Sequence, residues 1–172
     1  MKETISWIKT IAAALIFAYL ITTFIIVNAQ VPSGSMKNTI NEGDRLIANR
    51  LSYLFSDPER FDIVVFKFPD NEDLYYIKRI IGLPGETVEI KDGKVYIDGS
   101  EEPLDDSFIL EEMYDEPDQI YEVPEDCYFM LGDNRNNSAD SRRWVNKYVK
   151  REKILGKAIF KYYPGFELLT NK

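Results

Sequence analysis

The chain contains no histidine and one cysteine, which limits the chemistry that its side chains can perform. Without an imidazole there is no Ser-His-Asp triad, no Cys-His pair and no His-ligated metal, and one cysteine cannot supply a zinc site. The sequence therefore predicts no metal and no other cofactor. Any hydrolytic reaction must use a different base, and lysine can serve because a neutral amine accepts the proton of a serine hydroxyl.

Ser35 is the candidate nucleophile. It lies in Pro32-Ser33-Gly34-Ser35-Met36, shortly after a long apolar segment that ends at Val27. The chain between Val27 and Ser35 reaches at most about 26–29 Å when extended, so a membrane-embedded segment would hold Ser35 near the bilayer surface. An enzyme that acts where chains leave the membrane would need its nucleophile there. A flexible linker beside the membrane is the alternative.

Lys78 is the candidate base. It lies within residues 75–81, a run of aromatic and β-branched residues that is typical of a strand. In a strand, Tyr76, Lys78 and Ile80 share one face. These neighbours could desolvate the amine, and burial lowers the pKa of a lysine because it disfavours the charged form. A lysine whose charged end reaches the surface fits the same pattern, so this segment leaves both interpretations open.

Residues 132–142 form the densest polar run in the chain, directly after the apolar residues 127–131. Its aspartates, arginines and small amides suit an internal network of hydrogen bonds and ion pairs that could fix a neighbouring site. A solvated turn is the alternative. A calcium loop is disfavoured, because Ser138 stands where an EF-hand loop needs glycine and Trp144 where it needs glutamate.

Residues 10–27 carry no charge and predict a transmembrane helix. As a helix they span roughly 27 Å, close to a hydrocarbon thickness of about 30 Å. Lys2 and Lys9 precede the segment, which predicts a cytoplasmic N-terminus and an extracytoplasmic remainder. A cleaved signal peptide is the alternative, although the apolar run is longer than the usual core of about 7–15 residues.

This organisation predicts a single-pass protein of the plasma membrane with the lipid bilayer as a partner. Residues 1–29 form the cytoplasmic tip and anchor, and residues 30–172 form one extracytoplasmic domain. The formal net charge of -8 argues against nucleic acid as a partner, because phosphate binding needs clustered lysines and arginines.

The remainder of the chain predicts a mainly β fold, an antiparallel β domain preceded by one transmembrane helix. Strands are expected at residues 62–68, 75–81, 87–90, 94–97, 127–131 and 154–163. The acidic residues 101–119 are expected to form a solvated, mobile loop. The short apolar run at residues 51–55 could be core or a surface that dips into the membrane.

The order of these segments resembles the bacterial type I signal peptidases, in particular the short, single-anchor type of Gram-positive bacteria. The corresponding motifs are Pro32-Ser33-Gly34-Ser35-Met36, Gly43-Asp44-Arg45, the lysine motif at residues 76–86 and the polar motif at residues 132–142. The resemblance implies a serine endopeptidase with a Ser-Lys dyad, built from coiled antiparallel sheets. Its substrates would be the signal peptides of exported preproteins, which it removes.

The resemblance also implies roles for individual residues. Ser35 would be the nucleophile and Lys78 the base, while Ser33 would add its hydroxyl to an oxyanion hole beside the Ser35 N–H. Ser138 would orient the Lys78 amine. Supporting ion pairs would join Asp133 to Arg79 and Asp140 to Arg142.

Three residues depart from the family pattern. Asn38 stands where proline is usual, Asn136 where aspartate is common and Val145 where glycine is common. Two other functions are compatible with parts of the sequence. One is a self-cleaving Ser-Lys protein such as the SOS repressors, which the apolar segment argues against. The other is a non-enzymatic, membrane-anchored extracellular binding module.

Overall fold

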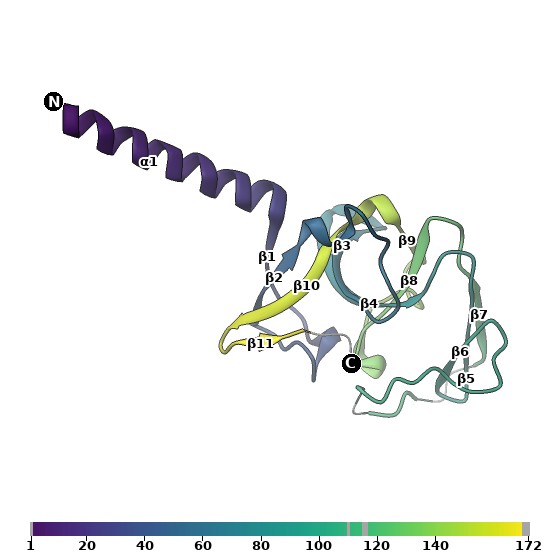
Figure 1. Cartoon of the computed structure of the whole chain (residues 1–172). Helices are drawn as coiled ribbons and strands as arrows, with labels where there is room; N and C mark the ends of the chain where they lie inside the picture. The colour runs from purple at the N-terminus through teal and green to yellow at the C-terminus, as the bar shows by residue number, and fades with distance from the viewer. Residues whose placement is uncertain (1, 110, 115–116, 170–172) are drawn as a thin grey trace.

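A long helix at the N-terminus projects away from a body of strands (Figure 1). The computed structural model describes residues 2–109, 111–114 and 117–169. Helix α1 (Lys2–Leu20) continues into a π-helical turn, η1 (Ile21–Ile25). By length and composition, Glu3–Ile25 could cross a membrane, and none of this apolar window is buried within the protein. The helix ends earlier than the sequence indicated, because the chain extends into a strand from Ile26.

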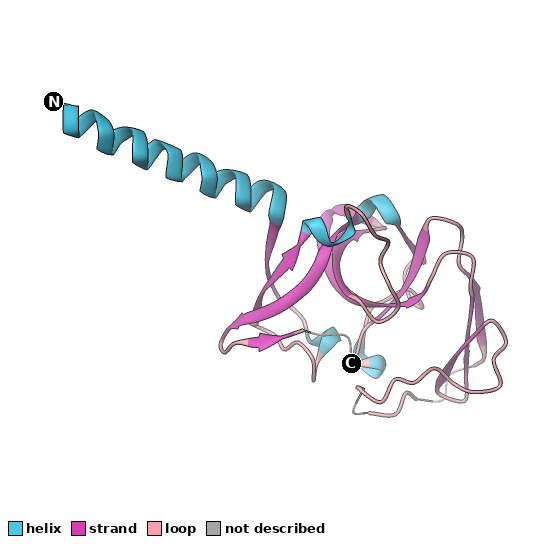
Figure 2. Cartoon of the chain, viewed as in Figure 1, coloured by secondary structure: helices cyan, strands magenta, loops and turns pink. Residues whose placement is uncertain are grey.

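The strands form two antiparallel sheets, shown in magenta in Figure 2. The large sheet has the order β1-β2-β10-β3-β4-β8-β9, with β11 paired to β10, and the small sheet has the order β6-β5-β7. The strands of the large sheet are β1 (Ile26–Gln30), β2 (Arg45–Asn49), β3 (Ile63–Phe68), β4 (Asn71–Gly82), β8 (Cys127–Leu131), β9 (Tyr148–Lys150), β10 (Ile154–Tyr163) and β11 (Glu167–Leu168). The small sheet contains β5 (Thr87–Lys91), β6 (Lys94–Ile97) and β7 (Gln119–Glu122).

This architecture confirms the predicted fold class, a mainly antiparallel β protein preceded by one apolar helix. The segments that were expected to be strands correspond to β3, β4, β5, β6, β8 and β10, except that β3 begins at Ile63, one residue later than expected. The structure adds short 3-10 turns, of which η2 (Gly34–Met36), η3 (Arg50–Tyr53) and η4 (Arg135–Asn137) bear on the site, and η5 (Arg151–Lys153) lies before β10.

Three hydrophobic clusters fix the elements around the site. The first includes Met36 and Ile40, whose buried side chains anchor the segment that follows β1. The second packs β3 against β4 and β8 through residues such as Phe66 and Ile80. The third joins the small sheet to β8, where Phe129 is fully buried. Burial of these side chains stabilises the strands from which the turns around the site extend.

The short apolar run at residues 51–55 is mostly exposed. Tyr53 is buried, but Leu51 and Leu54 are exposed, and Phe55 is 95% exposed. η3 contacts η1, so this run lies beside the end of the N-terminal helix. Of the two expectations for this segment, core packing therefore holds only for Tyr53.

The acidic segment differs from the expected solvated loop. We call residues 104–109 and 111–114 the acidic strap. Its Met113 is buried in the third cluster, and the Leu104 N–H donates to the carbonyl of Val95 in β6. Acidic residues dominate this segment, and the sequence pattern therefore suggested a solvated loop. In the structure, a few apolar side chains pack the strap against the protein.

Candidate active site

Ser35 lies in the 3-10 turn η2, close to where β1 ends. Met36 anchors this turn because its side chain is almost completely buried. Asn134 holds the turn from the other side: its N–H donates to the Ser35 carbonyl at 3.1 Å, and its side-chain amide donates to the Gly34 carbonyl at 2.9 Å. The turn that carries Ser35 is therefore fixed to the loop after β8.

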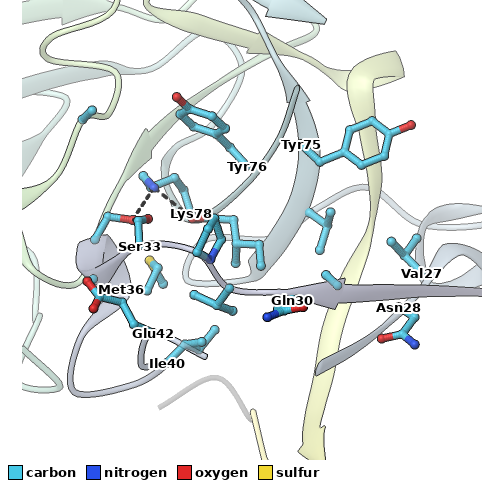
Figure 3. A pocket seen from close by; sticks show the side chains of 18 of the residues that line it. Val27, Asn28, Gln30, Ser33, Met36, Ile40, Glu42, Tyr75, Tyr76 and Lys78 are labelled. Atoms are coloured by element: carbon cyan, nitrogen blue, oxygen red, sulfur yellow. Dashed lines mark hydrogen bonds between the residues drawn. The ribbon is translucent and has the colours of Figure 1, made fainter. Parts of the chain in front are cut away.

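The amine of Lys78 reaches the hydroxyl of Ser35. Lys78 Nζ lies 2.7 Å from Ser35 Oγ and 3.1 Å from the carbonyl oxygen of Ile77. The Lys78 side chain extends from β4 toward the turn that carries Ser33 (Figure 3). Lys78 is only 3% exposed. The sequence left open whether the Lys78 amine is buried or reaches the surface, and in the structure it is buried.

The surroundings of Lys78 change its acidity. Burial lowers the pKa of Lys78 to about 8, because the charged ammonium loses its hydration. The carboxylates of Asp140 and Asp133 oppose this effect and raise the pKa in part. The amine also lies 5.4 Å from the centre of the Tyr76 ring, on the strand face that the sequence predicted. A lysine of this pKa is neutral in a sizeable fraction of molecules near neutral pH.

Two further serines lie at the site. Ser33 Oγ is 3.5 Å from Ser35 Oγ and is exposed to the groove described below. The buried Ser138 Oγ has no hydrogen-bond partner among the described residues, so the structure does not bond it to Lys78. Ser138 nevertheless borders the site: a Cβ on Gly132 would collide with both Ser138 Oγ and the carbonyl oxygen of Ser35.

Two buried ion pairs lie behind these residues. Arg79 binds Asp133 through two hydrogen bonds, Nε to Oδ1 at 2.8 Å and Nη2 to Oδ2 at 2.6 Å. Arg142 binds Asp140 in the same bidentate way, at 2.9 and 3.0 Å. Both side chains of each pair are at most 2% exposed. Such paired charges are strongly oriented, and each guanidinium offsets the charge of a carboxylate near Lys78.

The carboxylates connect this scaffold to the loops that carry Ser35 and Ser138. Thr39, just after the nucleophile turn, donates to Asp133 Oδ2 at 2.5 Å. The N–H of Gly132 donates to Asp140 Oδ2 at 3.1 Å. Thr39, Gly132 and Asn134 carry no sequence signal for these contacts other than their position inside or beside the motifs.

The three departures from the family pattern have different structural settings. Asn38 has φ of 83°, a left-handed conformation that asparagine tolerates and that the proline ring forbids. Asn136 makes two hydrogen bonds to the acidic strap. Val145 is 87% exposed, and its N–H donates to Asp70 on the surface.

A groove with a volume of about 780 Å³ leads to Ser35 (Figure 3). One wall is β1, which pairs only with β2 among the described strands. The other is the first part of β4, which pairs with β3 alone until Arg79 meets β8. Apolar side chains make up part of the lining: Val31, Met36, Ile40, Val65, Ile77 and Ala139. Two unpaired strand edges facing one groove suit an extended peptide, which can add as a strand.

An antiparallel β fold with a serine and a buried lysine in hydrogen-bond contact defines the setting of a serine hydrolase that works without histidine. The family model described as "Signal peptidase, peptidase S26" matches residues 4–163. The chain belongs to this family.

Individual relatives agree with the family match. A probable signal peptidase I-2 of Synechocystis sp. is 44% identical over 166 residues, covering 91% of this chain and 72% of the relative. The signal peptidase I S of Bacillus subtilis is 35% identical, covering 97% of this chain and 93% of the relative. A crystal structure of a signal peptidase I from Enterococcus faecalis is 36% identical and covers 59% of this chain and 97% of that chain, with a TM-score of 0.49.

Gly132→Ala should damage the site without removing any functional group. The new methyl would collide with Ser138 Oγ and the Ser35 carbonyl oxygen, so the nucleophile would move. A displacement of about 1 Å can reduce turnover roughly 100-fold. The measurement is the turnover of a model preprotein. Gly165→Ala is the control, because a Cβ there meets nothing within 4 Å. Equal turnover of both variants would contradict the close approach.

Proposed function

We propose that Ser35 is the nucleophile and Lys78 the general base of this signal peptidase. The enzyme is a serine endopeptidase that removes signal peptides from preproteins. The observation that supports the two roles best is the 2.7 Å contact between Lys78 Nζ and Ser35 Oγ at a lysine that is 3% exposed. Non-enzymatic binding as the main function is not supported, because the family that the chain matches is a peptidase family.

The reaction begins when neutral Lys78 takes the proton of Ser35 as Oγ attacks the carbonyl carbon of the scissile bond. A negative charge develops on the carbonyl oxygen, and in this proposal the Ser33 hydroxyl and the Ser35 N–H donate hydrogen bonds to it. The Lys78 ammonium then protonates the leaving amine, the C–N bond breaks and an ester to Ser35 forms. Water attacks this ester with Lys78 again as base, which releases the signal peptide and restores Ser35.

Ser138 and the ion pairs have supporting roles in this proposal. The unpartnered hydroxyl of Ser138 borders the site, and it is available to accept a hydrogen bond when Lys78 becomes an ammonium ion. The Arg79–Asp133 and Arg142–Asp140 pairs hold the loop that carries Ser138. No metal and no cofactor takes part in the proposed steps.

The substrate is proposed to lie as an added strand in the groove. An extended peptide would pair with β1, with the first part of β4, or with both, and alternate side chains would point into the wall. Val31, Ile40 and Ile77 line this groove, and the proposal is that it accepts small side chains before the scissile bond. The apolar part of a signal peptide leaves the bilayer at the end of the groove near Ile26, which follows the anchor.

The proposed topology places the N-terminus in the cytoplasm and residues 30–172 outside the plasma membrane. Its support is the apolar helix with Lys2 and Lys9 near its start. Residues 1–29 then contain the cytoplasmic tip and anchor, with the lipid bilayer as partner, although the edge strand β1 already begins at Ile26.

The first test replaces the proposed base. Lys78→Met and Lys78→Arg should both lower the single-turnover rate by roughly 1,000-fold or more, because neither side chain can accept the Ser35 proton. Ser35→Ala should be equally inactive. Lys94→Met is the matched control, since Lys94 is an exposed lysine in the strand β6. If a folded Lys78 variant cleaves within about tenfold of wild type, Lys78 is not the base.

Lys78→Met should also be more stable than the wild type at pH 7. At that pH lysine is mostly charged in both the folded and the unfolded protein, and only the folded state buries the charge. The lowered pKa of Lys78 corresponds to about 3 kcal/mol, which methionine would avoid. Thermal unfolding of the two proteins measures this difference and also verifies that the inactive variant is folded.

The second test is the pH dependence of activity. Since burial lowers the pKa of Lys78 to about 8, kcat/KM should rise with pH, reach half its maximum near pH 8 and fall about tenfold per unit in acid. The same lowered pKa means that the unfolded state binds more protons between about pH 8 and 10.4, so folding stability should rise in that window. A flat profile between pH 6 and 9 would be inconsistent with a lysine base.

The third test concerns topology. Protease added to intact spheroplasts should digest the extracytoplasmic part, residues 40–172, because the proposed orientation exposes it. A cytoplasmic marker protein serves as the control for intact membranes. Survival of this part until the membrane is lysed would show that the orientation is reversed.

A further inference from the structure

The acidic strap contacts each of the three buried arginines behind the catalytic site. Its first contact is an ion pair, in which Arg135 Nη1 donates to Asp106 Oδ2 at 2.8 Å. The Arg135 side chain is 1% exposed, and its Nε and Nη2 have no partner among the described residues. Asp106 is therefore the carboxylate that pairs directly with this buried charge, and Asp133 acts on the charge as well.

The second contact is made by Phe108. Its ring centre lies 4.2 Å from the guanidinium carbon of Arg79, and the ring also meets Phe61 edge-on at 5.5 Å. A ring over a guanidinium attracts the cation and excludes water from it. Arg79 is the partner of Asp133, so Phe108 covers the rear of that ion pair.

The third contact is at the far end of the strap. Arg142 Nη1 donates to Met113 Sδ at 3.2 Å, and Arg142 is the partner of Asp140. Asn136 fastens the strap here with both ends of its amide: Nδ2 donates to the Glu112 carbonyl at 2.9 Å, and Oδ1 accepts from the Tyr114 N–H at 2.8 Å. An aspartate in place of Asn136 would lack the side-chain N–H that donates to the Glu112 carbonyl.

We propose that the acidic strap is a positioning element of the active site, which holds from behind the arginines that orient the carboxylates around Lys78. The inference rests on the proposed role of Lys78 as base. Asn136, Phe108 and Asp106 are positioning residues, since none of them touches the reacting atoms. The strap thereby has a role in catalysis although it lies outside the groove.

The effect of the strap on Lys78 has a definite sign. The charged groups around Lys78 are Asp133 and Asp140, each paired with an arginine, while the groove wall adds Glu42 and Arg50. Detaching the strap would let water reach the scaffold and loosen the arginines. Better hydration of Lys78 and less neutralised carboxylates both favour the ammonium form, so both raise the pKa of Lys78.

The test compares pH profiles of Asn136→Ala and Phe108→Leu with the wild type, using the full chain and a model preprotein. Asn136→Ala removes two hydrogen bonds to the strap without adding a charge, and Phe108→Leu keeps an apolar side chain but removes the ring over Arg79. The midpoint of the pH limb should rise by about half a unit or more in each. Turnover at pH 7 should fall roughly threefold, while the plateau at high pH stays near that of the wild type.

Two controls separate positioning from general damage. Asn146→Ala also removes two side-chain amide hydrogen bonds, but to surface partners, the Asp70 carboxylate and the Pro69 carbonyl, and Glu111→Ala removes an exposed acid of the strap. Both should leave the midpoint unchanged. The inference is overturned if Asn136→Ala and Phe108→Leu keep the wild-type midpoint, even if their plateau at high pH falls. It is also overturned if Asn146→Ala shifts the midpoint by the same amount. If the wild type itself lacks the limb, or Lys78→Met stays active, the base assignment has failed instead.

Discussion

The proposed base has to give up its proton readily beside a hydroxyl, which requires that its amine is kept away from water, and much of the structure serves this requirement. Lys78 emerges from the middle of the large sheet, where β3, β4 and β8 are packed by a continuous hydrophobic cluster. Two carboxylates lie near it and favour its protonation. Because each carboxylate is held by an arginine in a bidentate pair, much of its charge is already neutralised, and the scaffold can be rigid without cancelling the effect of burial.

The same sheet also provides the space for the substrate. β4 is a strand of 12 residues, but β8 pairs only with its last part, so the first part keeps an open edge. β1 lies across the groove with a second open edge. Open edges expose unpaired amides and carbonyls and are a risk for aggregation, so proteins usually cover them. Here the two edges face each other across a groove that ends at the nucleophile, which fits a peptide that occupies them only during turnover.

The sequence predicted the central parts of this arrangement because local patterns encode them. The strand that contains Lys78 and the strand before the polar motif follow aromatic and β-branched content. The absence of histidine excluded an imidazole base, and the resemblance to the signal peptidases then selected Ser35 and Lys78. The edge strand β1 was not anticipated, since Ile26 and Val27 continue the apolar composition of the helix and five residues show little periodicity. The strap was expected to be solvated because its acidic residues outnumber the few side chains that dock it, such as Met113.

Other parts of the site depend on contacts that no local pattern contains. Asn134 and Gly132 lie far along the chain from Ser35, and their roles follow only from the packing of the loop after β8 against the nucleophile turn. Asn38 departs from the expected proline, and the left-handed backbone at this residue supplies a reason that the sequence could not.

The anchor, the edge strand β1 and Ser35 follow one another directly along the chain, and this fixes the distance between the end of the helix and Ser35. No loop separates η1, which ends at Ile25, from β1, and Ser35 follows within the next turn. A strand advances about 3.3 Å per residue and hardly stretches, so the height of Ser35 above the end of the helix is set by residue count. In the proposed topology, this height is measured from the surface of the bilayer. A substrate whose scissile bond lies too close to its own apolar segment, or too far from it, would therefore not bring that bond level with Ser35, whatever side chains flank the bond.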